Sequence, residues 1–588
     1  MRTTTGALFS RVLADAGITY VAGIPGHTNY DFADALLDEK RITPLTLRHE
    51  AIGTFAADAY FRVSGKLMAV FTHTLAGTAN GIVGVANAYA DSSAMLLIVG
   101  EEPRSVLGRG AYQELGRSMD ADVPQMVRHV TKRTWLTHIP LQIVEQTYRA
   151  IRTATLGRPG PTSIHVFCDL WEQEVELPDW PSPVGFLPAK NDFRPCGTEI
   201  DRAAHLLRKA SSPVILAGNG INLSRAHNEL LELAETYRIP VATTVAGKGA
   251  FPENHALSLG VMGWVGSSAA NWAASHADVL FAVGARTSET TTSSWQAKGQ
   301  LNPSKTLLIH ADIDPTEISN VFPVGASLIG DAKATLADLN QALHGWKAPI
   351  DWMNALAVEK EKWKTVCKAA LTRISVPQSV GPIVQGLRDL TVGMPLNIIC
   401  DAGKHHKWLV QQFETHAKDI VVSSMGAGTM GLGPCGAVGA ALGRPEAKTI
   451  CWVGDGGMSM FLPVLPTAAE YKIPVIFIVI DDNCYGAVAN AQMGRYKRTA
   501  YSEFNGNGTN QEFKIDLAAV SEACGVPSRK VDNPDGFKQA LRWAMDQSGP
   551  VMIDVVVDQG SVAPNGGGFK LGDVWNHPIH PWTGMPEK

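Results

Sequence analysis

The chain has 588 residues, of which 45% are hydrophobic and 18% charged, and its formal net charge is −5. This length and composition are those of a globular protein with about three to four domains, and the charge, without a long basic run, argues against a nucleic-acid partner. We see no signal-peptide core, no apolar stretch long enough to span a bilayer and no CxxC pair among the eight cysteines. We therefore expect a cytoplasmic protein with no membrane contact, zinc site or disulfide framework.

Short apolar runs alternate with helical periods in three successive blocks of the chain. This alternation predicts an α/β fold of three doubly wound domains, and runs that are apolar throughout predict parallel sheets buried on both faces. The first block covers residues 1–180 and ends in a Pro-rich connector at 177–183. Its predicted strands are 20–24, 44–47, 67–71, 94–99 and 162–166.

The second block covers residues 195–345, and a polar, helix-like segment leads from it to the third block at 375–560. The last segment, 561–588, is rich in Gly and Pro, and we expect it to form a closing tail. The predicted strands of these two blocks are 213–217, 240–243, 279–283 and 306–310, followed by 397–400, 449–453, 474–480 and 551–556.

Two acidic turns follow successive strands of the third block. Gly454-Asp455-Gly456 comes directly after the strand at 449–453, and Asp481-Asp482-Asn483 ends the next strand, 27 positions from Asp455 to Asp482. Hard cations that carry a diphosphate take a few oxygen ligands from the protein, and a tight glycine turn lets backbone N–H groups approach phosphate oxygens. The two turns therefore predict a metal–diphosphate site.

This spacing resembles the magnesium–diphosphate motif of thiamine diphosphate (ThDP) enzymes. Asp482 stands where that family usually has Asn, so Asn483, one position later, is the alternative metal ligand. The residues that the resemblance implies at the metal and the diphosphate are Asp455, Gly456, Gly457, Asp482, Cys484 and Tyr485, of which Asp455, Asp482 and Cys484 would hold the metal.

Glu50 begins a predicted helix after the strand at 44–47. A buried glutamate has a raised pKa and can share a proton with a ring nitrogen, whereas a glutamate at an exposed helix start only stabilises the helix dipole. The segment from His49 to Gly65 resembles the glutamate helix of the acetolactate synthase group of ThDP enzymes. The resemblance implies that Glu50 is the catalytic carboxylate beside the pyrimidine ring, where it promotes removal of the thiazolium C2 proton.

Two more segments resemble that group. Residues 428–431 match its Gly-Thr-Met-Gly segment, which implies that Gly428 and Met430 contact the cofactor and that Met430 bends it from beneath the rings; a core methionine is the alternative. Residues after the strand at 397–400 match a Gly-Gln-His segment, with Lys in place of Gln; without the resemblance, this histidine would be taken as a surface residue. The diphosphate contacts implied by this match are Gly403, Lys404 and His405.

The second block has the pattern Gly218-Asn219-Gly220 after its first strand, which alone is a weak nucleotide-binding signal. Successive segments of this block resemble the FAD-contacting segments of acetolactate synthase. Family members without flavin keep much of this pattern and some place ADP there, so FAD, ADP and no ligand are the alternatives, and a bound flavin need not take part in the reaction. The implied contacts are Gly218, Gly284, Arg286, Asp312 and Asp331.

Side chains near the thiazolium select the substrate. Gln113 matches an active-site glutamine of the branch, whereas His27 stands where acetolactate synthases have Gly, and His73 falls in a loop that is rich in Gly, Ser and Pro in those enzymes. The two histidines would be titratable donors near neutral pH, and their bulk argues against a plain acetolactate synthase; loop residues that bind backbone are the alternative. The segment at His27 resembles that of cyclohexane-1,2-dione hydrolase, although Tyr30 stands where that enzyme has a second histidine.

These segments together resemble the acetolactate synthase branch of ThDP enzymes. The resemblance implies a ThDP- and magnesium-dependent C–C lyase or carboligase that acts on a 2-oxo acid, α-diketone or acyloin through the ThDP ylide. The alternatives are acetolactate synthase itself, which acts on pyruvate, a flavin-dependent 2-oxo acid oxidase, and a silent cofactor-binding scaffold. The family also implies a homodimer or homotetramer with active sites between chains.

Overall fold

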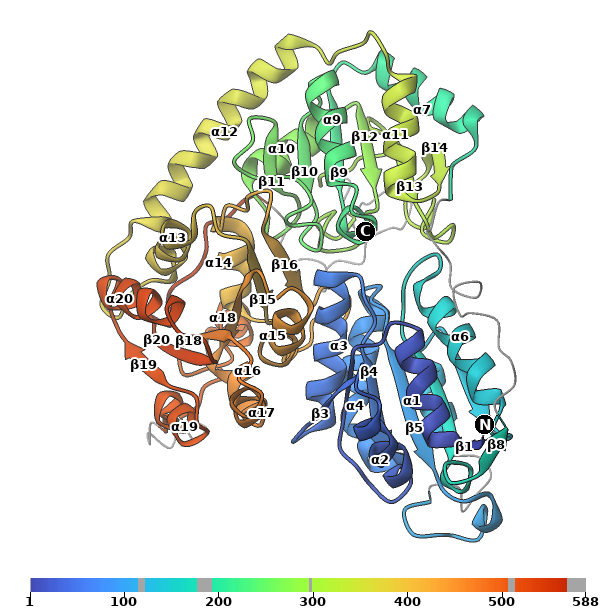
Figure 1. Ribbon diagram of the computed structural model, residues 1–588. Coiled ribbons are helices and arrows are strands. Elements are labelled where there is room, and N and C mark those ends of the chain that lie inside the picture. Colours follow the sequence, from blue (N-terminus) through green and yellow to red (C-terminus); the bar gives the residue numbers. More distant parts are fainter. Residues whose placement is uncertain (1, 115–121, 177–192, 296–298, 506–512, 568–588) are drawn as a thin grey trace.

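The computed structural model describes residues 2–114, 122–176, 193–295, 299–505 and 513–567. Three six-stranded parallel sheets follow one another along the chain, and β1 (Arg2–Thr4) pairs with β8 (Glu174–Glu176) in a small antiparallel ribbon (Figure 1). The predicted α/β fold with three doubly wound parallel sheets is confirmed. The Pro-rich connector at 177–183 and the tail from residue 568 lie outside the described residues.

The first sheet has the strand order β3-β2-β4-β5-β7-β6. Val70 and Leu97 enter one hydrophobic core and their neighbours Ala69 and Leu96 enter another, so both faces of the sheet are buried, as the two-residue period of a strand requires. Its strands are β2 (Tyr20–Gly23), β3 (Thr43–Thr46), β4 (Ala69–His73), β5 (Leu96–Glu101), β6 (Arg133–Thr137) and β7 (Thr162–Phe167); its helices are α1 (Thr5–Asp15), α2 (Tyr30–Asp38), α3 (Glu50–Ser64), α4 (Thr74–Ala90), α5 (Val123–Arg128) and α6 (Gln142–Thr155).

The second sheet has the order β11-β10-β9-β12-β13-β14, so the chain changes its direction of winding between β9 and β12. In open α/β sheets, ligands bind outside the carboxyl ends of the strands at such a point. The strands are β9 (Pro213–Ala217), β10 (Val241–Thr243), β11 (Ser258–Val261), β12 (Val279–Val283), β13 (Leu307–Asp312) and β14 (Val324–Ile329); the helices are α7 (Gly197–Lys209), α8 (Asn219–Ser224), α9 (His227–Tyr237), α10 (Ser268–His276), α11 (Ala332–Ala342) and α12 (Ile350–Leu371).

The third sheet has the order β16-β15-β17-β18-β20-β19, which is the same path as that of the first sheet. The long helix α12 leads to it from the second sheet (Figure 1). The strands are β15 (Leu396–Cys400), β16 (Ile420–Ser423), β17 (Lys448–Gly454), β18 (Val475–Asp481), β19 (Ser528–Val531) and β20 (Val551–Val556); the helices are α13 (Val380–Thr391), α14 (Lys404–Gln412), α15 (Leu432–Gly443), α16 (Asp455–Met460), α17 (Val464–Glu470), α18 (Gly486–Tyr496), α19 (Leu517–Ala523) and α20 (Pro534–Met545).

In the three six-stranded sheets, the strands that the sequence did not predict all lie at the ends of the strand order. They are β6, β11, β14, β16 and β19, each at one end of its sheet. An edge strand can be partly exposed and need not be apolar throughout; β19, for example, has no buried residue. The expectation that every strand is fully buried is therefore wrong for the edges, although it holds for central strands such as β9, β12 and β18.

The first and third domains meet along α3 and α15, which lie side by side (Figure 1). Glycines on α15 permit a very close approach: a Cβ atom at Gly439 would lie 1.8 Å from the Ala56 carbonyl oxygen, and one at Gly436 would lie 3.1 Å from Ala59 Cβ. One hydrophobic core contains residues of both domains. This contact holds the glutamate at the start of α3 in a fixed position relative to the third sheet.

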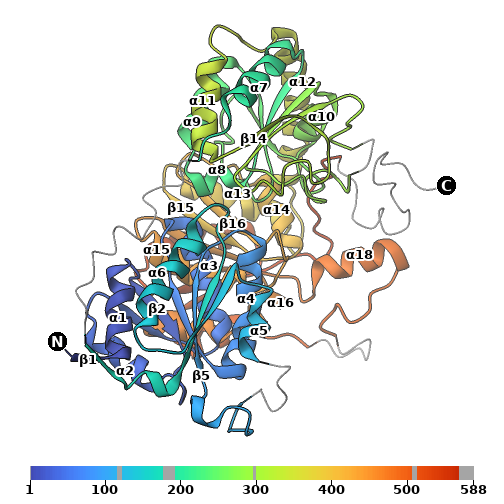
Figure 2. The same cartoon turned by 90° about the vertical axis from the view of Figure 1, so that its right-hand side faces the viewer.

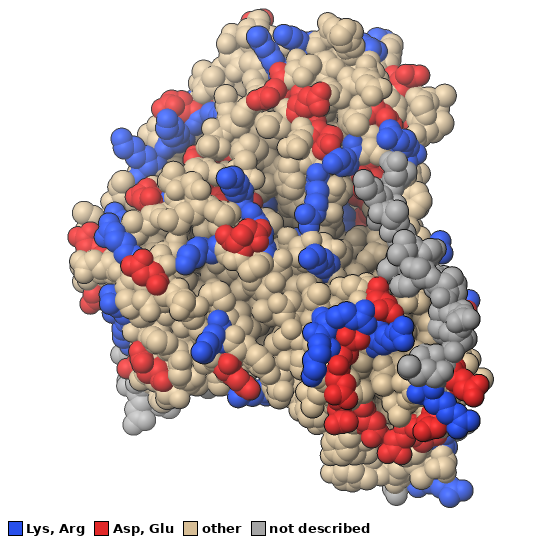
Figure 3. All heavy atoms as spheres, in the orientation of Figure 1, with Lys and Arg blue, Asp and Glu red and all other residues tan. Residues whose placement is uncertain are grey.

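Helix α18 projects from the body of its own domain (Figure 2) and carries exposed Val488, Met493 and Tyr496. On the face shown in Figure 3, acidic and basic side chains are interspersed, which agrees with the small net charge. None of the helices in the described part of the chain has the length and apolar character needed to cross a membrane.

Candidate active site

Asp455 and Asp482 lie at the carboxyl ends of β17 and β18, which are neighbours in the third sheet. Both residues are buried. Burial, together with the adjacent charges of Asp482 and Asp481, raises the pKa of Asp455 to about 8. Two buried carboxylates of like charge are costly unless a cation lies near them. The two acidic turns identified in the sequence therefore do come together, at the carboxyl ends of two neighbouring strands of the third sheet.

Lys404, at the start of α14, is a cation in contact with this pair. Its Nζ lies 2.6 Å from Asp482 Oδ2 and donates to the Gln559 carbonyl oxygen at 2.7 Å, while Gln559 Nε2 donates to the Asp482 carbonyl oxygen at 2.9 Å. At the diphosphate site, Lys404 and Asp482 both depart from the pattern of the resembled family, and they are partners in one ion pair. The positive charge of Lys404 thus compensates the negative charge of Asp482.

Cys484 lies beside Asp482, and its thiol donates to Asp482 Oδ1 at 3.4 Å. Burial and the Asp482 charge raise the pKa of this thiol well above its usual range. A protonated thiol is a poor ligand for a hard cation, which prefers oxygen, so any contribution of Cys484 to a metal would come from its carbonyl group. The Asn483 carbonyl accepts from the Phe504 amide at 3.2 Å.

Glycines around these acids allow neighbouring side chains to pack directly against the backbone. A Cβ atom at Gly403 would lie 2.5 Å from the His405 ring, and one at Gly456 would lie 2.7 Å from the Tyr485 ring. A Cβ atom at Gly457 would clash in the same way with the Asp401 carboxylate. His405 is buried, its Nε2 has no hydrogen-bond partner among the described residues, and burial lowers its pKa to about 3. His405 is thus a neutral, buried ring and not a surface residue.

Met430 and Gly428 lie in the loop before α15, outside the third sheet. Gly428 has a φ of 63°, and a Cβ atom there would meet no other atom within 4 Å. The loop is tied to α4 of the first domain by Asn87, whose Oδ1 accepts from the Thr429 hydroxyl at 2.8 Å and from the Ser424 hydroxyl at 2.6 Å. Met430 is half-buried, so it is not a fully enclosed core residue.

Glu50 is buried between α3 and α4. Asn80 Nδ2 donates to its Oε2 at 3.0 Å, and Gly77 lies against Oε1, where a Cβ atom would be only 3.0 Å away. The exposed, dipole-stabilising interpretation is therefore wrong. Among the described residues, Glu50 has no hydrogen bond or ion pair to the Asp455 cluster.

His27 and His73 lie at the carboxyl ends of β2 and β4, with ring centroids 4.6 Å apart. The Thr28 hydroxyl donates to the Gly100 carbonyl at 3.0 Å, so it accepts from His73 Nδ1 at 2.8 Å. His73 Nε2 lies 2.7 Å from Gln113 Oε1. If the His73 ring is neutral, its Nε2 accepts a hydrogen bond from the side-chain NH₂ group of Gln113. If the ring is protonated, Nε2–H donates to Gln113 Oε1.

Gln113 adopts a positive φ of 66°, which is rare for a residue with a side chain and typical of functional loops. Glu114 supports this conformation, because its Oε2 accepts from the amides of Gly110 and Ala111 at 2.8 and 2.9 Å. The three residues predicted to face the substrate therefore lie together: a hydrogen bond joins His73 to Gln113, and a ring contact joins His27 to His73. This group also contains Glu102, which the sequence analysis missed: both Glu102 oxygens lie near His27 Nε2, and the only signal was its place directly after a strand end.

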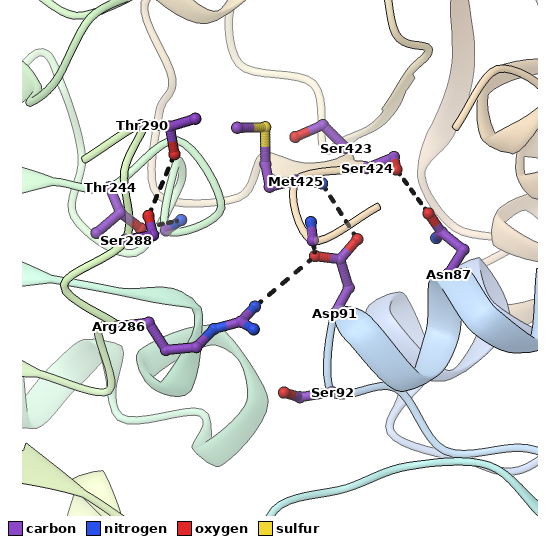
Figure 4. Close-up of polar contacts among 12 residues, drawn as sticks. Asn87, Asp91, Ser92, Thr244, Arg286, Ser288, Thr290, Ser423, Ser424 and Met425 are labelled. Atoms are coloured by element: carbon purple, nitrogen blue, oxygen red, sulfur yellow. Dashed lines mark hydrogen bonds and ion pairs between the residues drawn. The ribbon is translucent and has the colours of Figure 1, made fainter. Parts of the chain in front are cut away.

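A cavity of about 370 Å³ opens at the carboxyl ends of β9, β12 and β13, at the switch point of the second sheet. Arg286 enters it and forms an ion pair with Asp91 at 4.0 Å; Asp91 in turn accepts from the Met425 amide at 3.1 Å (Figure 4). All three domains thus line this cavity. Asp312, whose pKa is raised by burial, and Asp331, which caps α11, also line it.

The predicted glycines of this block have a packing role. A Cβ atom at Gly218 would lie 2.0 Å from the Gly284 carbonyl oxygen, because the turns after β9 and β12 cross there. Gly284 lines the cavity, whereas Gly218 packs behind it. The close crossing brings backbone groups of both turns to the switch point.

Comparison with known proteins agrees with this architecture. Residues 3–121, 200–339 and 401–555 match the N-terminal TPP binding domain, the central domain and the C-terminal TPP binding domain of thiamine pyrophosphate enzymes. The probable acetolactate synthase large subunit of Methanocaldococcus jannaschii is 33% identical over 94% of this chain and 92% of its own length. The chloroplastic acetolactate synthase 2 of Nicotiana tabacum is 31% identical over 95% and 84%, and the large subunit of Parasynechococcus marenigrum is 31% identical over 92% and 86%.

Proposed function

Because this chain belongs to the thiamine pyrophosphate enzyme family, we propose that it is a ThDP- and Mg²⁺-dependent C–C lyase or carboligase acting on an α-diketone, acyloin or 2-oxo acid. The observation that carries the proposal is the group formed by His27, His73 and Gln113. It presents two titratable rings where, by resemblance, acetolactate synthases have small residues, next to a glutamine that the branch shares. Such a group can orient a substrate oxygen and exchange protons with it.

The residues of the third domain fit a magnesium diphosphate. Asp455 and Asp482 supply buried carboxylates, and His405 supplies a buried nitrogen without a partner beside the glycine turns. The described residues contain no group of three metal-ligating side chains, which suits a cation that takes its other ligands from phosphate and water. When bound, ThDP supplies an electron sink for breaking or forming a bond next to a carbonyl.

The side chains of the protein would perform the remaining steps, namely proton transfer, substrate binding and support of the cofactor. Glu50, buried and held by Asn80, holds the proton shared with the pyrimidine ring. His27, His73 and Gln113 would bind the substrate oxygens, and the two imidazoles would move protons to and from them. Met430, half-buried in its loop, would lie against the rings of the cofactor.

We further propose that the cavity of the second domain holds a nucleotide, with FAD as the first candidate and ADP as the alternative. A volume of about 370 Å³ at the switch point supports this assignment. The visible absorption spectrum of the purified protein separates the two, since only flavin is coloured. The exposed apolar residues of α18 support a homodimer or homotetramer, which sedimentation measurements can test.

Acetolactate synthase is the second candidate, because the relatives described above carry that name. The experiment is reconstitution of the protein with ThDP and Mg²⁺, incubation with pyruvate, benzoin or cyclohexane-1,2-dione in parallel, and identification of products by mass spectrometry. Cleavage of the diketone or acyloin without pyruvate turnover supports the lyase proposal. Acetolactate from pyruvate, with no other product, would replace it by the synthase.

A further inference from the structure

Glu102 is a buried carboxylate that follows β5 directly. Its two oxygens lie 3.0 and 3.1 Å from His27 Nε2. The segment after it is anchored by Arg104, whose amide and guanidinium both bond the Asp169 carboxylate, at 3.1 and 2.6 Å. The carboxylate is therefore held from both sides, by the end of β5 and by this anchor, next to the His27 ring.

The contact determines which nitrogen of His27 carries a proton. A carboxylate only accepts hydrogen bonds, so the nitrogen that faces Glu102 must be an N–H group. The lone pair of the neutral ring then belongs to Nδ1, which has no hydrogen-bond partner among the described residues. The side chain of His27 is 36% exposed, while that of Glu102 is only 7% exposed. The ring thus combines a shielded charge partner with a basic nitrogen that a ligand can reach.

We propose that Glu102 is a positioning residue that makes His27 the general base of this active site. In the reaction, a hydroxyl proton of the substrate or of water moves to His27 Nδ1, and the resulting imidazolium stays paired with the Glu102 carboxylate, which itself remains ionised. A fixed carboxylate stabilises that cation and holds the ring in the reactive tautomer. This inference rests on the proposed function, since it assigns a partner to one of the residues of that site.

The critical variant is Glu102→Gln, which keeps the size and a hydrogen-bonding group but removes the charge. We expect its kcat to fall about 10²-fold with KM changed by less than about threefold. The acidic limb of the kcat/KM profile should move to lower pH, because the protonated ring loses its partner. The ionisable groups around this pair are the His73 and Tyr112 side chains on the His27 side and Cys168 on the Glu102 side. Because these groups would also respond to the loss of a charge, Glu102→Asp, which retains the charge, is the necessary comparison. The Glu102→Asp variant should keep much of the activity.

Glu101→Gln is the matched control, because this neighbouring carboxylate bonds the buried His165 at 2.6 Å and not His27. It should remain within about threefold of the unaltered protein. A Glu102→Gln variant with unchanged kcat and an unchanged pH profile would overturn the inference. So would an equal loss of activity in Glu101→Gln, which would indicate a general disturbance of the end of β5.

A second measurement does not depend on turnover. In ¹⁵N-histidine NMR spectra at pH 8, His27 should carry its proton on Nε2, and Glu102→Gln should change this signal where Glu102→Asp and Glu101→Gln do not. If the unaltered protein converts none of the carbonyl substrates, the proposed function fails, and the NMR signal alone then decides whether Glu102 controls the His27 tautomer. If Glu102→Gln does not fold, the unaltered protein still tests the inference, because a His27 proton found on Nδ1 at pH 8 would overturn it.

Discussion

The ion pair between Lys404 and Asp482 offers a test of how the third domain tolerates buried charge without a bound cation. The two side chains are each only 7% exposed, and their charged atoms are 2.6 Å apart. Lys404→Gln leaves Asp482 next to Asp455 without this counter-charge. Asp482→Asn leaves the Lys404 ammonium buried. The double variant removes both charges together and keeps polar side chains of similar size.

Loss of one partner of a buried pair costs about 3–5 kcal/mol, whereas replacement of both partners costs little. We therefore expect each single variant of the apo-protein to be destabilised by about 3 kcal/mol or more, and the double variant by less than about 1 kcal/mol. For a domain of 150–250 residues, roughly 2–4 °C of Tm corresponds to 1 kcal/mol. The single variants should then lose at least about 6 °C in the transition of the third domain.

The assay is differential scanning calorimetry of the four proteins, with and without Mg²⁺ and ThDP. Lys404→Gln should regain stability when the metal and the diphosphate are added, because the bound cation can then neutralise the carboxylates. Additive losses in the double variant would refute the reasoning, since independent residues add and coupled ones do not. Equal stability of all four apo-proteins would show that solvent already screens this pair.

Three further outcomes are expected. Glu50→Gln should leave the fold intact and slow C2 proton exchange of bound ThDP by at least 10²-fold; an unchanged exchange rate in NMR would contradict the role of Glu50. Burial and the Asp481 charge raise the pKa of Asp554 from 3.8 to about 6, so the stability that its protonated form contributes is complete below pH 4 and is lost as the pH rises through about 6. Asp554→Asn should therefore gain up to about 3 kcal/mol over the unaltered protein between pH 4 and pH 7, and parallel Tm curves over this range would exclude the effect. Gly439→Ala should destabilise the domain contact by more than about 2 kcal/mol, because its Cβ would meet the Ala56 carbonyl, while Gly494→Ala, with open space around it, should be neutral or stabilising; similar Tm values for the two would argue against close packing of α3 and α15.

Much of the fold was predictable because it depends on patterns of neighbouring residues. Central strands such as β9 and β18 are apolar throughout, since both their faces are buried, and this makes them visible in the sequence. The turn at Asp455 directly follows such a strand, so its place at the carboxyl end of the sheet was predictable from the sequence as well. Five of the six edge strands escaped prediction; β19, for example, has no buried residue, and its exposure removes the apolar run.

Contacts between side chains from distant parts of the chain were not predictable from the sequence. Glu102 pairs with His27 because β2 and β5 flank β4 in the sheet, and Lys404 meets Asp482 because β15 and β18 flank β17. The sequence by itself determined the strands, the glycine turns and the chemical types of the candidate residues, because these depend on neighbouring positions. Only the tertiary structure decided which of them are partners, because strand order and domain packing bring together residues that the sequence keeps apart.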